Sequence, residues 1–427
     1  MYRVWTFVST YSLLMVLGAV LALIWANLDP ASHHAFAEAV LWEGGWIGEP
    51  TFGPDGEVLT RSLTVAYLSK DVLMALFFAV AGKEVWEAVA LRDGSLRGRK
   101  ALVPLLSAVG GMAAPVAVYL LLAALLGSAT WDALAHGWAV PTATDIALSF
   151  IVARIVFGPG HPAVLFLLLL AIVDDALGLL IIAVFYPKGA LQPEWLLLSA
   201  GAVLLVWLLC NRLPLWRDRG DPLMRHSTWM RTRLSFWPYA LAGAASWYAF
   251  QEAGLHPSLG LLPVIPAIPH ADRDFGVYAA TEEAMPDLLN RIEHALKVPV
   301  ELILFFFGLV NAGVAVAALG APTWLVLAGL LVGKPLGITL AAWLAARRLG
   351  LGLSEGMGLR DVLVVGFIAS MGFTVALFVA GVAFSPDLVL NGVPVQDAAR
   401  LGALLSVVGG LVAVVAARLL GVRRRPA

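Results

Sequence analysis

Long apolar segments recur from one end of the chain to the other, and they exclude an ordinary soluble domain. A helix that spans a bilayer needs about 20 mostly apolar residues. Hydrophobic residues make up 60% of the chain and charged residues only 13%, against roughly 45–50% and about 25% in soluble domains. The sequence predicts an all-α polytopic membrane protein. It forms one membrane domain over residues 1–427 with twelve transmembrane helices, of which the seventh and eighth are short. The segments run roughly over Thr6–Asn27, Leu63–Ala88, Ala101–Leu126, Ala133–Val156, Ala163–Phe185, Trp195–Cys210, Leu234–Gln251, His256–Ile268, Val298–Leu319, Pro322–Ala346, Val362–Phe384 and Leu401–Leu420.

Lysine and arginine alternate between the two sides of these segments. With the N-terminus placed inside, 22 of the 28 Lys and Arg residues fall in inside segments, three in outside segments and three within spans. Because these residues accumulate on the cytoplasmic side, we expect both termini in the cytoplasm. The net charge of −1 hides this segregation and therefore implies nothing about nucleic acid, and we expect no nucleic-acid partner. The single cysteine, Cys210, excludes an intramolecular disulfide and a cysteine-based metal site.

One segment outside the predicted spans has a turn signal. Trp46–Ser62 contains Pro-Asp-Gly between two short extended runs, which is typical of a β-hairpin. We predict a small hairpin on the outer face, with an irregular loop as the alternative.

Two adjacent carboxylates lie in the middle of the fifth segment. Asp174 and Asp175 have apolar residues on both sides, and an ionisable residue at the bilayer centre costs ~2.5–3.5 kcal/mol on insertion scales. Two neighbouring carboxylates cannot both be ionised cheaply there, so either a proton or a cation must relieve them. Oxygen ligands suit a hard cation such as Na⁺. The pair predicts cation/proton exchange, with a buried Lys334 ion pair that binds no ion as the alternative.

Two segments carry residues that interrupt helices. Asp145 and Thr144 follow Pro141 within the fourth segment, and proline inside a span removes a backbone hydrogen bond. Gly372 and Thr374 lie near the middle of the eleventh. In transporters, broken helices direct their ends at ion sites near the bilayer midplane. We predict two broken helices that cross at mid-membrane, although glycine in a span also marks close helix packing.

Three further charges lie within predicted spans. Lys334 is deep in the tenth segment, too far from either end to reach an interface, so we expect its ammonium to pair with an aspartate. Asp71 and Glu84 lie toward opposite ends of the second segment. They are either solvated end charges or residues of a funnel that leads to the site.

At these residues the chain resembles the NhaA-type sodium/proton antiporters of bacterial inner membranes. The order of the matching motifs fits from about the second segment to the twelfth. The motifs are LMALFFAVAGKEV at Leu73–Val85, ATDIA at Ala143–Ala147, AIVDDALG at Ala171–Gly178, NAGV at Asn311–Val314, GKPLGI at Gly333–Ile338 and GFT at Gly372–Thr374.

The resemblance implies a role for each matching residue of the site. Asp174 and Asp175 would bind Na⁺ (or Li⁺) and the protons, and Thr144 would line the site. Asp145 and Lys334 would balance the dipoles of the helix ends, with Lys334 also pairing Asp174. The transported ions would be the only ligands, with no cofactor and no enzymatic reaction.

The resemblance also implies features away from that site. Glu84, Glu293 and His294 match positions linked to pH response, and His256 matches a histidine on the short eighth span. Trp46–Ser62 would be a dimerising hairpin, so that the protein is a homodimer. Residues 101–185 and 322–420 would be inverted repeats. The implied function is exchange of Na⁺ for H⁺ across the inner membrane, serving pH and sodium homeostasis.

The pH-response region departs from the family pattern. Lys83 stands where the family has Leu, and Trp86, Glu87 and Ala88 replace Lys-Arg-Glu. We therefore expect the ion site to be retained and the pH dependence to differ.

Other functions remain as alternatives. They are a K⁺/H⁺ exchanger, a cation channel and an intramembrane aspartyl protease. The protease is the weakest, because the Gly-x-Gly-Asp setting that it needs is absent from the sequence and the two aspartates are adjacent on one helix.

Overall fold

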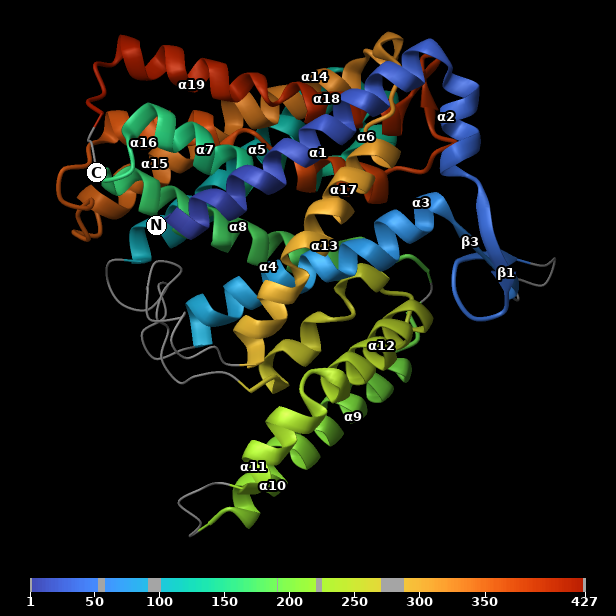
Figure 1. The fold of residues 1–427 in the computed structure, drawn as a ribbon. Helices are drawn as coiled ribbons and strands as arrows, with labels where there is room; N and C mark the ends of the chain where they lie inside the picture. Colours follow the sequence, from blue (N-terminus) through green and yellow to red (C-terminus); the bar gives the residue numbers. More distant parts are fainter. Residues whose placement is uncertain are drawn as a thin grey trace. The chain divides into compact units, whose positions relative to one another are not determined.

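The computed structural model describes residues 2–52 (backbone only for 2–13), 58–90, 101–189, 191–219, 225–269 and 288–424, and it is mostly helical (Figure 1). The chain forms two compact units. Unit 1 comprises Met1–Ala35, Ser95–Ile181 and Phe305–Ala427, and unit 2 comprises Phe36–Gly94 and Ile182–Leu304. Three helices, α2 (Pro30–Ala37), α8 (Pro162–Phe185) and α13 (Leu288–Asn311), have residues in both units.

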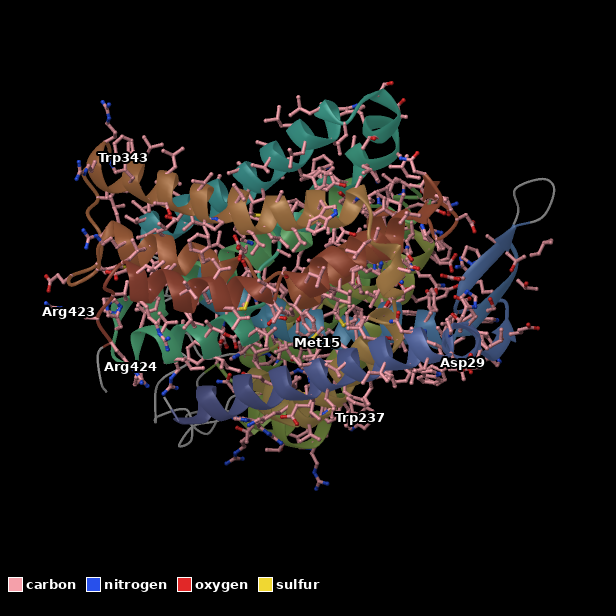
Figure 2. The ribbon with its side chains drawn as sticks, turned by 90° about the horizontal axis from the view of Figure 1, so that it is seen from above. Met15, Asp29, Trp237, Trp343, Arg423 and Arg424 are labelled. Atoms are coloured by element: carbon pink, nitrogen blue, oxygen red, sulfur yellow. The ribbon has the colours of Figure 1, made fainter. Side chains whose placement is uncertain are left out.

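Unit 1 is a set of packed helices. They are α1 (Tyr2–Leu28), α5 (Leu102–Leu125), α6 (Ser128–Leu134), α7 (Ile146–Phe157), α14 (Ala321–Ala328), α15 (Lys334–Arg347), α16 (Leu359–Ala369), α17 (Phe373–Ala383), α18 (Val395–Leu405), α19 (Val408–Leu419) and most of α8. The short helix α2 (Pro30–Ala37) follows α1. Figure 2 places Arg423 and Arg424, which follow α19, at the opposite end of this unit from Asp29, which follows α1.

Small residues let α5 and α15 pack closely. A Cβ added to Gly337 would clash with the carbonyl oxygen of Gly110, and one added to Gly333 would press on the backbone of Pro115. Glycines of this kind allow helices to approach closely in membrane proteins. The packing fixes the start of α15, where the side chain of Lys334 is completely buried.

Two helices of unit 1 are broken. The stretch Ser128–Thr142, which ends in the 3-10 segment η3 (Ala135–Thr142), meets α7 at 52°, and α16 meets α17 at 51°. Pro141 lies in the last turn before the first break, and Ala143 is extended. These are the positions at which the sequence predicts interruptions. The backbone N–H of Asp145 donates to the carbonyl oxygen of Met371 over 2.7 Å, so the two breaks lie directly against each other.

Unit 2 combines helices with a small sheet. Its helices are α3 (Val65–Tyr67), α4 (Met74–Ala90), α9 (Trp195–Val206), α10 (Leu213–Arg217), α11 (Arg225–Trp229), α12 (Trp237–Glu252) and the 3-10 segments η6 (Pro257–Leu259) and η7 (Leu262–Ala267), together with the first part of α13. The strands β1 (Val40–Gly44), β2 (Glu49–Phe52) and β3 (Val58–Thr64) form an antiparallel sheet in the order β1-β3-β2. The sheet has three strands where two were expected, and the Pro-Asp-Gly turn lies outside the described residues.

Judged by the length and apolar composition of its helices, the structure has fewer candidate membrane spans than the sequence predicts. Within the described residues, six helices are long and apolar enough to cross a membrane, and the two bent pairs raise the number to eight. The eighth segment forms a short apolar helix, as expected, and its prolines and a glycine give it 3-10 turns in place of α-helical ones. The ninth helix begins about ten residues earlier than predicted, at Leu288, and ends at Asn311, since its first turns are amphipathic rather than apolar.

A short β-ribbon completes the described structure. Strands β4 (Val389–Leu390) and β5 (Val393–Pro394) pair across a turn at Asn391 and Gly392, which both have positive φ. The ribbon leads directly into α18.

Candidate functional site

The carboxylate of Asp145 accepts hydrogen bonds at the N-terminal ends of two half-helices, α7 and α17. Asp145 precedes α7, and its Oδ1 accepts a hydrogen bond from the backbone N–H of Leu148 over 2.9 Å. Its Oδ2 accepts the backbone N–H of Thr374 over 3.2 Å, near the start of α17, and also the Thr374 hydroxyl. Helix N-termini carry partial positive charge and unpaired N–H groups. The buried Asp145 therefore offsets both half-helix ends at once.

The C-terminal ends at the breaks have their own partners. The Lys334 ammonium donates to the carbonyl oxygen of Thr142, the last residue of η3, over 2.5 Å. The Thr144 hydroxyl lies 3.1 Å from the carbonyl oxygen of Ala369, the last residue of α16. A cation and a hydroxyl thus face the two ends where backbone carbonyls are left over.

Asp174 is joined to the same two side chains. Its Oδ2 lies 3.1 Å from Lys334 Nζ and accepts a hydrogen bond from Thr144 Oγ1 over 2.7 Å. Both charged groups are buried, and Asp174 Oδ1 has no hydrogen-bond partner. The expected ion pair between Lys334 and an aspartate is therefore present. It leaves one carboxylate oxygen of Asp174 available to a further ligand.

Asp175 is held quite differently. It is half-buried, and among the described residues no side chain makes a hydrogen bond or ion pair with its carboxylate. One aspartate of the pair is thus compensated by a lysine and the other is not. Within unit 1, the residues expected to form the ion site lie together, and their oxygens are of the type that binds hard cations.

Several contacts of the site carry no signal in the sequence. Lys334 is preceded by a π-helical turn, η10 (Gly329–Gly333), and such turns are frequent at functional sites. The Ser406 hydroxyl accepts the backbone N–H of Gly372 over 3.1 Å, and Met15 Sδ lies 3.1 Å from the Thr374 hydroxyl. Serine and methionine in apolar segments are common, so only the fold reveals these contacts.

A second charged cluster lies on α4 and α13 in unit 2. The Lys83 ammonium is buried and lies 2.7 Å from Glu87, 2.6 Å from Glu293 and 3.8 Å from Glu84, while His294 is exposed. Lys83 and Glu87 both depart from the family pattern, and the structure pairs them. The cluster contains two of the expected pH-response residues, Glu84 and Glu293, and both belong to unit 2, whereas Asp174 belongs to unit 1.

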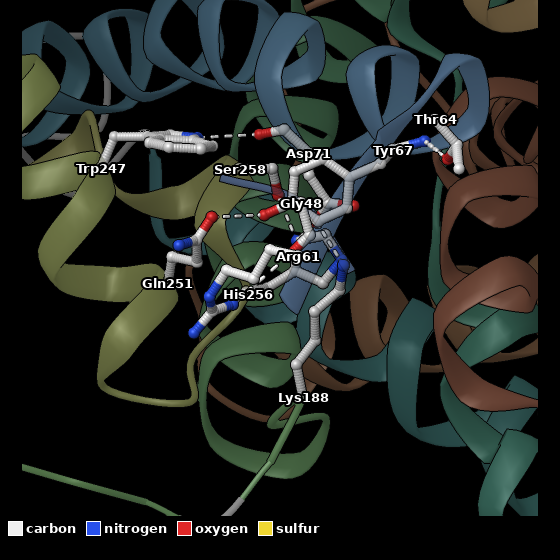
Figure 3. A network of polar contacts seen from close by, with 10 residues as sticks. All are labelled: Gly48, Arg61, Thr64, Tyr67, Asp71, Lys188, Trp247, Gln251, His256 and Ser258. Atoms are coloured by element: carbon white, nitrogen blue, oxygen red, sulfur yellow. Dashed lines mark hydrogen bonds and ion pairs between the residues drawn. The ribbon is translucent and has the colours of Figure 1, made fainter. Parts of the chain in front are cut away.

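Asp71 and His256, the remaining two candidates, meet in a third polar network (Figure 3). Asp71 is 1% exposed, so it is not a solvated end charge. Its Oδ1 lies 2.5 Å from Lys188 Nζ and 3.5 Å from the Nδ1 of the buried His256. Sequence reasoning placed Lys188 outside the membrane and gave no reason to pair it with Asp71.

Comparison with known proteins identifies the family of the chain. The family model described as Na⁺/H⁺ antiporter 1 matches residues 4–420. A protein of Jannaschia sp. (strain CCS1) named Na(+)/H(+) antiporter NhaA is 59% identical over 425 residues, covering 100% of both chains. A protein of the same name from Geobacter sulfurreducens is 41% identical over 421 residues, covering 97% of each.

A solved structure is similar at a lower level. The sodium proton antiporter MjNhaP1 from Methanocaldococcus jannaschii aligns with a TM-score of 0.49 and 14% identity, over 97% of this chain and 99% of that one. A similarity of that size carries no weight beside the sequence match. The apolar helices and the match along almost the whole chain mark a multi-pass membrane protein of bacterial type. The chain belongs to the Na⁺/H⁺ antiporter 1 family, whose members are transporters and not enzymes.

Proposed function

We propose that this protein exchanges Na⁺ for H⁺ and that Asp174 and Asp175 bind both ions in turn. The observation that carries the proposal is the unequal compensation of the two aspartates. Asp174 is bound to Lys334 and Thr144, whereas Asp175 has no partner among the described residues. A half-buried carboxylate without a partner gains most from a cation or a proton.

The chain's own groups supply what Na⁺ needs. Asp175, the free Oδ1 of Asp174 and the Thr144 hydroxyl offer oxygen ligands, which hard cations prefer. Na⁺ and the Lys334 ammonium would then compete for Asp174. Lys334 keeps a second partner in the Thr142 carbonyl oxygen, so it can loosen from Asp174 without losing every contact. Protonation of Asp174 and Asp175 would release Na⁺ and return the site to the charge that it had before Na⁺ bound.

The N-terminal helix ends at the breaks are balanced by Asp145, which makes no contact with the Asp174 and Lys334 pair in the hydrogen bonds and ion pairs described above. Asp145 is engaged with two backbone N–H groups and is therefore not free to bind Na⁺ fully. In this mechanism Asp145 fixes the breaks, and only the charge at Asp174 and Asp175 changes during exchange.

The proposal extends to the architecture of the membrane domain. Residues 101–185 contain a long helix, a broken helix and a long helix, and residues 322–420 repeat this order with nearly the same bend. This supports inverted repeats within a twelve-span protein of the bacterial inner membrane. The positions of Asp29 and Arg423 at opposite ends of unit 1 (Figure 2), together with the positive-inside pattern, support termini in the cytoplasm.

Everted membrane vesicles test the exchange. After respiration acidifies the lumen, addition of Na⁺ should reverse the quenching of a pH-sensitive dye, and Li⁺ and K⁺ measured alongside give the selectivity. Asp174→Asn and Asp175→Asn should each abolish or cripple the response, because each removes a charge that binds the ion. Asp387→Asn is a matched control at an exposed position, and it should leave the response intact.

Three outcomes would contradict the proposal. Near-normal Na⁺-driven proton movement in Asp175→Asn would reject the site. Proton movement driven by K⁺ alone would show that K⁺, rather than Na⁺, is the substrate. Na⁺ flux without proton movement would indicate a channel. Protein levels in the vesicles separate loss of exchange from loss of insertion.

A further inference from the structure

A buried carboxylate in unit 2 is neutralised by a lysine that comes from a loop. Asp71 is 1% exposed, and its Oδ1 lies 2.5 Å from Lys188 Nζ. Lys188 follows the end of α8, its backbone N–H donates to the carbonyl oxygen of Gly254, and its side chain is 28% exposed. The lysine can therefore swing toward solvent without breaking a helix.

The backbone around Asp71 is shaped to hold the carboxylate in place. Asp71 lies in the π-helical turn η1 (Leu68–Leu73), and π-turns are frequent at functional sites. The carbonyl oxygen of Asp71 accepts a hydrogen bond from the indole N–H of Trp247 over 2.9 Å. The backbone of Asp71 is thus anchored by a group that does not compete for its carboxylate.

The surroundings of the Lys188 ammonium are those of a cation site. Nζ lies 4.9 Å from the ring centroid of the buried Tyr67, a distance typical of a cation–π contact. The Tyr67 hydroxyl donates to Gln251 over 2.8 Å, which fixes the ring. Asp71 Oδ2 is buried and has no hydrogen-bond partner. An anionic oxygen without a partner, on a carboxylate whose ammonium partner lies over an aromatic face, favours a cation over any other ligand.

Apart from Lys188, the basic side chains of this network have other partners. Arg61 is paired with Glu252 over 3.0 Å. His256 Nδ1 lies 3.5 Å from Asp71 Oδ1 but only 2.7 Å from the Ser258 hydroxyl. The contacts of His256 belong to the network in Figure 3, in which Lys188 is the cation closest to Asp71.

We propose that Asp71 and the ring of Tyr67 form a binding site for a small monovalent cation, and that the Lys188 ammonium closes this site as a tethered cation. A free alkali cation would bind when Lys188 swings out, and Lys188 would expel it on returning. The site is separate from Asp174 and Asp175, which belong to unit 1, so the inference goes beyond the proposed exchange.

Removal of the tether tests the site. Lys188→Ala is made in a background of Asp174→Asn and Asp175→Asn, which removes the proposed transport site. Thermal unfolding is followed at one pH and constant ionic strength, with Na⁺ or K⁺ replacing choline. Na⁺ or K⁺ should raise the midpoint saturably, since at ten times Kd a ligand of the folded state raises the folded-to-unfolded ratio about 11-fold. Adding Asp71→Asn should abolish this response.

A second measurement uses the intact lysine and does not depend on the stability of a variant. In the same background, acetic anhydride labelling of Lys188 is quantified by mass spectrometry. Rising Na⁺ or K⁺ should increase labelling relative to choline, because a displaced lysine is exposed. In Asp71→Asn, labelling should be high at every salt composition.

Insensitivity of both readouts to Na⁺ and K⁺ would overturn the site, as would an equal response to choline or in the Asp71→Asn variants. Failure of Na⁺-driven exchange in wild-type vesicles would reject the transport proposal without changing either readout here.

Discussion

At the scale of the residue, the single carboxylate of Asp145 joins two helix N-termini that are far apart in the sequence. Its two oxygens accept backbone N–H groups from Leu148 and from Thr374, which is 229 positions later in the chain. The sequence predicts that Asp145 balances helix ends, because it follows a proline within a span. It cannot predict which N–H groups are bound, since that depends on how two distant breaks meet.

Substitutions at Asp145 should show how much these two hydrogen bonds, each of which caps a helix N-terminus, contribute to the stability of the fold. Asp145→Ala removes both, and since a lost cap costs ~1 kcal/mol, unfolding should become easier by about 2 kcal/mol. Asp145→Asn keeps one carbonyl oxygen, but its amide nitrogen cannot accept the second N–H, so about half of that loss is expected. Unfolding in detergent, followed by the thermal midpoint, should rank the proteins as wild type, Asn and Ala.

Thr374→Val gives a matched control, because it removes the hydroxyl but keeps the backbone N–H. It should cost less than Asp145→Ala. Equal stability of wild type and Asp145→Ala would show that the caps contribute nothing to folding.

At the scale of the element, apolar length predicts helices but not their irregular parts. The long runs at Leu102–Leu125 and Pro162–Phe185 match predicted segments closely. The first turns of α13 were missed, because polar residues such as Asn290 and Arg291 lower the hydropathy of an amphipathic helix. The π-turn before Lys334 was also missed, since nothing in GLLVG distinguishes it from an α-helical turn.

The same limit applies to the polar networks. Asp174, Asp175 and Lys334 could be predicted because charges are rare in spans. The Asp71–Lys188 pair could not, since one residue lies in a span and the other in a loop 117 positions away. Such a pairing depends on the fold and leaves no local pattern.

The sheet supports a prediction about assembly. Both β1 and β2 are edge strands, and the sheet exposes large apolar side chains such as Trp42, Trp46 and Leu59. Exposed edges and apolar patches favour association with another chain. Deleting Ile47–Leu59 should weaken a homodimer while exchange remains measurable, because the proposed ion site lies within one protomer.

Native mass spectrometry and crosslinking in membranes measure this effect. The variant Arg61→Ala, which removes the ion pair with Glu252 but keeps the sheet residues Ile47–Leu59, is the control for loss of that contact. An unchanged dimer fraction would reject the role of the sheet in assembly.

At the scale of the whole molecule, the ion site and the charged cluster around Lys83 belong to different units. Asp145, Asp174 and Lys334 lie in unit 1, whereas Lys83 and Glu293 lie in unit 2. If Asp174 and Asp175 bind both ions, competition between Na⁺ and H⁺ arises within unit 1 alone. Substitutions in the Lys83 cluster should then shift the pH range of exchange without removing the competition.

Kinetics in vesicles at several pH values test this shared site. A carboxylate that coordinates Na⁺ must be deprotonated, so lowering the pH should raise the apparent KM for Na⁺ while the maximal rate changes less. With one competing proton, KM should rise roughly tenfold per pH unit below the relevant pKa, because each unit corresponds to ~1.4 kcal/mol of proton binding. That pKa belongs to the coupled pair rather than to either aspartate.

The variant Lys83→Leu separates this competition from regulation by the other unit. Its KM should rise with the same slope as that of wild type, even if the curve moves along the pH axis. A constant KM for Na⁺ between about pH 6 and 9, together with a changing rate, would show that protons act at a separate gate. Na⁺ and H⁺ would then not share Asp174 and Asp175, and the pairing of Lys334 with Asp174 would be structural rather than part of the exchange.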